Sequence, residues 1–142
     1  MTDIARQQEL AVAHIVSLGG EALPDDCYSP ELTAWSPVSG LMSRSQYLDK
    51  LPDVRSAFSE PLAMQIDRCT SEPGATAVQC RSSGVLRNGA HYSNDYHMLV
   101  EFDAEGRIRH VREYMDSQRA QEVLMPFLRE WMARQAQERA QA

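Results

Sequence analysis

Four segments in the second half of the chain alternate apolar and polar residues, and turns of hairpin length separate them. The segments cover residues 62–69, 76–86, 92–102 and 107–115. Such alternation is typical of strands that bury one face. Asn88-Gly89, between the second and third segments, accepts the positive φ angles of a tight hairpin turn. Because short turns join antiparallel strands, the sequence predicts a four-stranded antiparallel meander.

Helical patterns lie on both sides of this meander. Apolar residues recur with helical spacing in residues 4–18, and a capping-box pattern of Ser43 with Gln46 begins a second helix. Pro52 should interrupt that second helix, because proline removes a backbone donor. After Asp116 the chain is predicted to be helical to its end.

This order of elements predicts an α+β fold in one domain, residues 1–142. We expect a curved antiparallel sheet with the N-terminal helices against one face, followed by a C-terminal helix. Pro126 should kink that last helix, which should close one end of the fold up to about Trp131. Residues 133–142 should be solvated.

Composition excludes several partners. The net charge is −6 and the pI near 5.1, which argues against nucleic acid or an anionic membrane as the main partner. No stretch has the length and hydropathy of a membrane span, and the N-terminus does not resemble a signal peptide, so we expect a cytoplasmic protein. The three cysteines form no Cys-x-x-Cys pair, and phosphate-binding glycine loops are absent. We therefore expect no metal site.

Residues 92–102 place two tyrosines and an amide on the face that should be buried. Tyr92, Asn94 and Tyr96 share that face with apolar residues. A curved sheet can leave a hollow above its concave face, where a ligand satisfies polar groups. We expect Tyr92 and Asn94 to line it as catalytic hydrogen-bond donors to a carbonyl or oxyanion, and Tyr96 to bind substrate. Both tyrosines are alternatively core residues with satisfied hydroxyls.

Glu113 is the strongest candidate for acid–base chemistry. Alternation along the last strand groups it with Val111 and Met115, the more apolar set, which should face inward and contribute to substrate binding. Burial would raise the pKa of the carboxyl group toward the range useful for proton transfer. Alternatively, Glu113 pairs with a nearby arginine, or a slipped register turns it outward.

Three further residues are candidates for substrate binding. Trp35 follows a predicted loop at the pocket mouth and either walls the pocket or belongs to the core. Arg81 could neutralise Glu113 or hold an anionic substrate. His14 lies near the apolar stripe of the first helix, where it either reaches the cavity or is a satisfied buried histidine. Asp116 is expected to cap the last helix.

The pattern Tyr92-x-Asn94-x-Tyr96, an acidic turn with Gly106 and "IRHVREYMD" resembles the SnoaL-like branch of the NTF2-like superfamily. Ketosteroid isomerase and limonene epoxide hydrolase belong to that superfamily. The resemblance extends from the first helix to about Leu124 and is specific over roughly Gly89 to Asp116. It implies a cone-shaped fold with a deep pocket, dimers formed through the sheet, and cofactor-independent chemistry.

The resemblance also implies roles for individual residues. In the phenazine-biosynthesis B protein a glutamate in Arg-Glu-Phe-Met is the acid–base residue, and it matches Glu113. A pocket tyrosine of that protein matches Tyr92. The aspartate that is the base in limonene epoxide hydrolase also matches Glu113. That hydrolase needs an Arg-x-Asp on a neighbouring strand, where this chain has Arg81-Ser82-Ser83, so we do not expect epoxide hydrolysis.

Two functional hypotheses remain open at this point. The first is an enzyme that isomerises, cyclises, dehydrates or hydrates a hydrophobic carbonyl-bearing molecule, with Glu113 moving a proton. The second is a non-catalytic module that binds a ligand or a protein through the same cone, because a fold does not determine a function. We expect a hydrophobic small molecule as a partner, and a homodimer.

Overall fold

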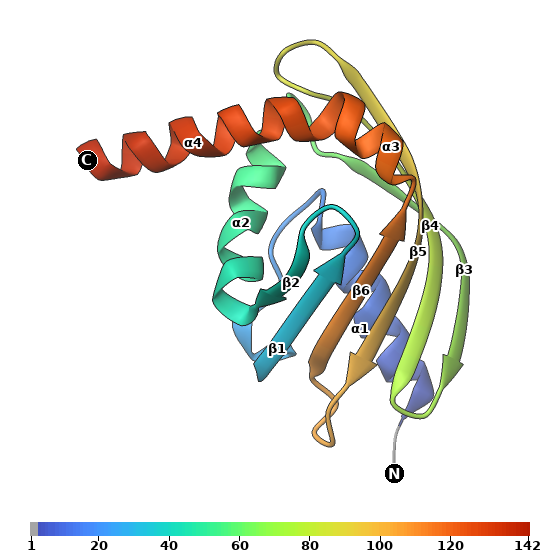
Figure 1. The fold of residues 1–142 in the computed structure, drawn as a ribbon. Helices are drawn as coiled ribbons and strands as arrows, with labels where there is room; N and C mark the ends of the chain where they lie inside the picture. Colours follow the sequence, from blue (N-terminus) through green and yellow to red (C-terminus); the bar gives the residue numbers. More distant parts are fainter. Residues whose placement is uncertain (1–2) are drawn as a thin grey trace.

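The computed structural model describes residues 3–142 and shows a curved six-stranded sheet that partly wraps around helices (Figure 1). The strand order across the sheet is β2-β1-β6-β5-β4-β3. The strands have the following bounds: β1 (Tyr28–Ser36), β2 (Gly40–Ser43), β3 (Ala63–Glu72), β4 (Ala75–Val85), β5 (His91–Phe102) and β6 (Ile108–Met115). The sheet is open, with β2 and β3 at its two edges.

Helices precede, interrupt and follow the strands, as the α+β prediction required. They are α1 (Ile4–Ser17), the 3-10 turn η1 (Asp25–Cys27), α2 (Arg44–Ser56), α3 (Ser117–Arg119), the π-helical turn η2 (Ala120–Leu124) and α4 (Met125–Gln141). In Figure 1, α1 lies along the sheet, α2 stands beside β1 and β2, and α4 crosses over one end. Among the described residues, no helix is both long and apolar enough to cross a membrane.

The predicted meander is confirmed, because β3, β4, β5 and β6 pair with their neighbours in antiparallel fashion. The turn between β4 and β5 differs from the expected one. Only Gly89 has a positive φ, +87°, whereas Asn88 does not. Asn88 instead accepts the backbone N–H of Ala90 through Oδ1 at 3.0 Å, so its side chain stabilises a longer loop.

The sheet is mixed, and the prediction of a wholly antiparallel sheet is wrong in this respect. β1 runs parallel to β6, with Ala34 opposite Val111. β1 is also longer than expected and forms a hairpin with β2. Sequence alternation does not reveal whether a distant strand joins the sheet in parallel or antiparallel orientation, since that depends on the path of the chain through α2 and β3.

The two helical prolines behave differently from expectation. Pro52 lies inside a continuous α2, although a proline there costs about 3 kcal/mol. Burial of Tyr47 and Leu51 on this helix helps offset that cost. Pro126 stands in the first turn of α4, directly after the π-helical turn Ala120–Leu124. The irregularity therefore precedes Pro126, in a position that proline tolerates.

The last helix extends to Gln141, as predicted, and its end is better anchored than the sequence indicated. Side chains in its last two turns are mostly exposed, and Figure 1 shows its end projecting beyond α2. However, the Arg139 guanidinium binds the nearly buried carboxylate of Asp53 on α2, with N···O distances of 3.0 and 3.3 Å. Trp131 donates its indole N–H to Ser56 Oγ at 2.9 Å. α4 is thus attached to α2 at two points.

Candidate functional site

A cavity of about 300 Å³ lies between α2, α4 and the sheet. That volume is at the lower end of the range for small-molecule sites. Most of the lining side chains are apolar, and they include five of the seven methionines in the chain: Met42, Met64, Met115, Met125 and Met132. Unbranched methionine side chains adapt to ligands of different shape. The cavity is therefore suited to a hydrophobic molecule.

Glu113 faces this cavity, as alternation along β6 predicted. It lies opposite Met98 of β5, and Met115 lines the same cavity two positions further along β6. Burial raises the pKa of its carboxyl group, and the positive charge of Lys50 opposes that rise. Within residues 3–142, no ion pair of 4.0 Å or less engages the carboxylate. The alternatives of an arginine partner and of a slipped register are therefore wrong.

Lys50 is the second charged residue among the described residues that line the cavity. It projects from α2, its Nζ lies 3.5 Å from Ser39 Oγ, and it stands 5.7 Å from the ring centre of Tyr47. Burial lowers the pKa of the amine, and Glu113 opposes this change. Our sequence reasoning missed Lys50. Its spacing of three residues from Tyr47, on one face of a helix, was the available signal.

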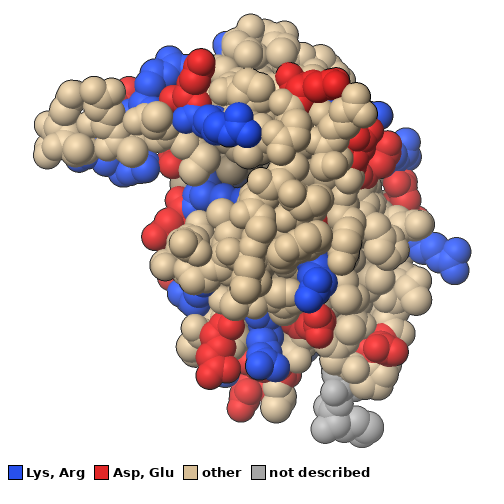
Figure 2. All heavy atoms as spheres, viewed as in Figure 1, with Lys and Arg blue, Asp and Glu red and all other residues tan. Residues whose placement is uncertain are grey.

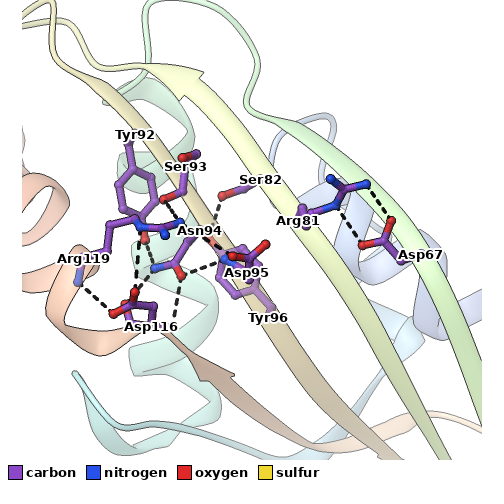
Figure 3. Close-up of polar contacts among 10 residues, drawn as sticks. All are labelled: Asp67, Arg81, Ser82, Tyr92, Ser93, Asn94, Asp95, Tyr96, Asp116 and Arg119. Carbon is purple, nitrogen blue, oxygen red and sulfur yellow. Dashed lines mark hydrogen bonds and ion pairs between the residues drawn. The ribbon is translucent and has the colours of Figure 1, made fainter.

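Tyr92 lines the cavity as predicted, but Asn94 does not. Asn94 is buried, and its amide makes four hydrogen bonds (Figure 3). Nδ2 donates to the Tyr92 hydroxyl at 2.7 Å and to the Asp116 carbonyl at 3.0 Å. Oδ1 accepts the backbone N–H groups of Asp95 and Asp116 at 2.8 and 3.1 Å. The expectation that Asn94 lines the pocket as a donor to substrate is therefore corrected: Asn94 positions Tyr92.

The remaining predicted residues of β5 and β6 divide between the cavity and the core. Tyr96 and Met115 line the cavity, and the Tyr96 hydroxyl is hydrogen-bonded to Ser82 Oγ at 2.9 Å. Val111 is instead fully buried in the main hydrophobic core. It borders only a small recess beside Glu113, so it does not contact a ligand in the cavity.

Arg81 and Trp35 lie away from the main cavity, contrary to expectation. Arg81 is exposed and makes two hydrogen bonds of 3.0 Å to Asp67 on β3 (Figure 3). Trp35 packs on the outer face of the sheet against Tyr114, with ring centres 5.1 Å apart. On β1, Ala34 is buried whereas Trp35 is only half-buried, because neighbouring residues of a strand point to opposite faces.

His14 is a buried histidine that does not reach the cavity. Its Nδ1 is 2.7 Å from the Tyr28 hydroxyl, and its Nε2 is 3.0 Å from the Tyr47 hydroxyl. Burial, with a smaller effect of Arg55, lowers the pKa of His14 to about 4, so the ring is neutral at pH 7. Since Tyr47 itself lines the cavity, His14 positions a cavity residue. Sequence reasoning missed both tyrosines.

We compared this architecture with that of known proteins. Neither a protein-family model nor a curated protein sequence matches the chain. Solved structures do match. An NTF2-like protein from Anabaena variabilis is 20% identical, with a TM-score of 0.67 over 81% of this chain and 93% of that chain. The chain has the NTF2-like fold.

Two further structures share the NTF2-like fold with this chain. A protein from Jannaschia described as a SnoaL-like polyketide cyclase is 14% identical, with a TM-score of 0.69 over 81% of this chain and 88% of that chain. An LEH-like epoxide hydrolase from M. tuberculosis is 14% identical, with a TM-score of 0.65 over 92% and 94% of the two chains. These similarities confirm the expected fold, in which a curved sheet encloses a cavity. At identities this low, a shared fold does not imply a shared reaction. The reaction has to be inferred from the residues that line the cavity.

Proposed function

We propose that this protein is a cofactor-independent enzyme that moves a proton on a hydrophobic, carbonyl-bearing small molecule. The reaction would be of the isomerase, cyclase or dehydratase type. One observation supports this most strongly: an acidic side chain with a raised pKa and no ion-pair partner among residues 3–142 faces an apolar cavity. A carboxylate in that setting is costly for stability and suited to proton transfer near neutral pH.

In this mechanism the Glu113 carboxylate removes a proton from the carbon beside the carbonyl group and returns it at another atom. The negative charge that develops on the carbonyl oxygen needs donors in the cavity. Tyr92 accepts a hydrogen bond from Asn94, so its own hydroxyl proton is free for such a role. The side chain of Lys50 lines the same cavity, and its N–H groups are further donors.

The names of the structural neighbours agree with this class of substrate. One is described as a SnoaL-like polyketide cyclase, and another as an epoxide hydrolase. Epoxide hydrolysis is the less suitable reaction here, because Arg81 is exposed and bound to Asp67 rather than directed at the cavity. A non-catalytic NTF2-like module that binds a ligand or a protein is the alternative function.

Exchange of substrate protons with heavy water tests the proposal. We would incubate a panel of apolar ketones and β-keto esters with the protein in D₂O and follow deuterium incorporation by mass spectrometry. Wild-type protein should accelerate exchange on at least one compound, and Glu113→Gln should lower that rate by about 10²-fold or more. Ligands that bind without any Glu113-dependent exchange would favour the non-catalytic module instead.

We also propose that the protein is a homodimer formed through the outer faces of two sheets, in the cytoplasm. The outer face carries Trp35, Arg112 and Tyr114, of which Tyr114 is 46% exposed. Figure 2 shows mostly uncharged surface in the middle of the viewed side, interrupted by a Lys or Arg side chain with an acidic one below it. The free cysteines agree with a reducing compartment. A monomer in light scattering at micromolar concentration would contradict the dimer.

A further inference from the structure

The single lysine of the chain, Lys50, faces the cavity of the proposed active site. Its side chain lines the apolar cavity together with Glu113, and its nearest polar contact is the Ser39 hydroxyl at 3.5 Å. No N···O distance of 4.0 Å or less joins Lys50 to a carboxylate among residues 3–142. The amine is thus neither solvated like a surface lysine nor held in an ion pair within that range.

We propose that Lys50 binds carbonyl compounds covalently, by condensing with an aldehyde or ketone group to form an imine. This inference rests on the cavity of the proposed function and adds an activity to it. A desolvated lysine in an apolar pocket is a recognised nucleophile for carbonyl carbons. The apolar lining of the cavity would bind the hydrophobic body of the compound and hold its carbonyl group near Nζ.

Imine formation needs only the Lys50 amine, the Glu113 carboxyl group and the carbonyl compound. The lone pair of Nζ attacks the carbonyl carbon, forming a C–N bond, and a proton moves from nitrogen to oxygen to give a carbinolamine. Glu113, protonated, then donates a proton to the hydroxyl group, which leaves as water. The nitrogen loses its remaining proton to the Glu113 carboxylate as the C=N bond forms. One amine and one carbonyl group become one imine and one water.

Glu113 is a suitable partner because burial raises its carboxyl pKa, while burial lowers the amine pKa of Lys50. Both effects increase the fraction of molecules in which the same cavity holds a neutral amine and a protonated carboxyl group. No N···O distance of 4.0 Å or less joins Lys50 to Glu113, so the two side chains do not form an ion pair within that range. The neighbour of Nζ on the same helix is the ring of Tyr47, which carries no negative charge that would hold the amine protonated.

Reductive trapping of the imine is the test. We would treat the protein with cinnamaldehyde and sodium cyanoborohydride and identify the modified residue by peptide mass spectrometry. The matched control is the double variant Lys50→Arg with Asp49→Lys, which moves the only lysine to an exposed position on the same helix. Lys50 should react at least about 10-fold faster than the lysine of the control, and Glu113→Gln should slow the reaction of Lys50 about 10-fold or more.

A reaction of Lys50 no faster than that of the exposed lysine would overturn the inference. If the double variant does not fold, the α-amino group in the wild-type sample provides the reference rate. Failure here is distinct from failure of the proposed function. Exchange in D₂O without trapping at Lys50 would contradict only the imine. Trapping without Glu113-dependent exchange would contradict only the proton-transfer reaction.

Discussion

Asn94 binds the backbone of Asp116 through both ends of its amide. The side chain thus makes the two hydrogen bonds that the backbone of a paired strand residue would make. Its Oδ1 accepts the Asp116 N–H at 3.1 Å, and its Nδ2 donates to the Asp116 carbonyl at 3.0 Å. The same Nδ2 holds the Tyr92 hydroxyl. This contact joins β5 to the residue that caps α3, and so links a cavity tyrosine to the start of the C-terminal helices (Figure 3).

Replacing Asn94 should therefore destabilise the protein rather than alter ligand contacts directly. Asn94→Ala removes the acceptor of the part-buried N–H groups of Asp95 and Asp116, and an unpaired buried group costs about 1–3 kcal/mol. The Asp116 carbonyl keeps the N–H of Ala120 as a donor. We expect the free energy of unfolding, measured in urea, to fall by at least about 2 kcal/mol. Asp95→Ala, on the same strand but exposed, should cost less than about 1 kcal/mol, because its ion pair with Arg119 is solvated. Equal losses in both variants would contradict this role.

Glu113 should lower the stability of the protein at neutral pH. Its carboxyl pKa is raised in the folded state, so the folded protein binds more protons than the unfolded chain above about pH 4.5. The contribution of this group to stability therefore decreases as pH rises from 4.5 to the folded pKa. The decrease is about 1.4 kcal/mol for each pH unit that separates the folded pKa from the unfolded pKa.

Glu113→Gln should accordingly raise the melting temperature more at pH 7 than at pH 4, while reducing any proton-transfer activity. Thermal unfolding followed by circular dichroism at both pH values would measure the effect. Glu101→Gln, on the outer face of β5, is the control and should show little pH-dependent change. A lower melting temperature for Glu113→Gln at pH 7 would mean that Lys50 stabilises the carboxylate more than burial destabilises it.

The sequence predicted the meander and the inward direction of Glu113 because both follow from local alternation, which strand geometry imposes directly. It also predicted that Tyr92 lines a hollow. It failed for Asn94, since a polar residue on the buried face meets either a ligand or a backbone group, and only the folded connection to Asp116 decides which. Lys50 and Tyr47 were missed because the position of α2 over the sheet depends on packing between distant segments.

His14 makes the protein sensitive to acid. Its pKa falls from 6.5 to about 4 on folding, so the unfolded chain binds more protons than the folded protein between those values. Stability should therefore decrease as pH falls from 6.5 to 4, by about 3 kcal/mol from this group. In His14→Gln, which keeps an amide for the hydroxyls of Tyr28 and Tyr47, the loss over that range should be smaller. An unchanged pH profile in urea unfolding would contradict the assignment.

The C-terminal turns of α4 should contribute to stability through Arg139 and Asp53. The side chain of Asp53 is only 9% exposed, and a carboxylate in that position needs a partner. Arg139→Gln should lower the melting temperature by removing that partner. In the background of Asp53→Asn, which has no charge to satisfy, the same substitution should have a clearly smaller effect. Additive losses in this double-mutant cycle would show that the two side chains do not interact in solution, and that the end of α4 is solvated as the sequence alone suggested.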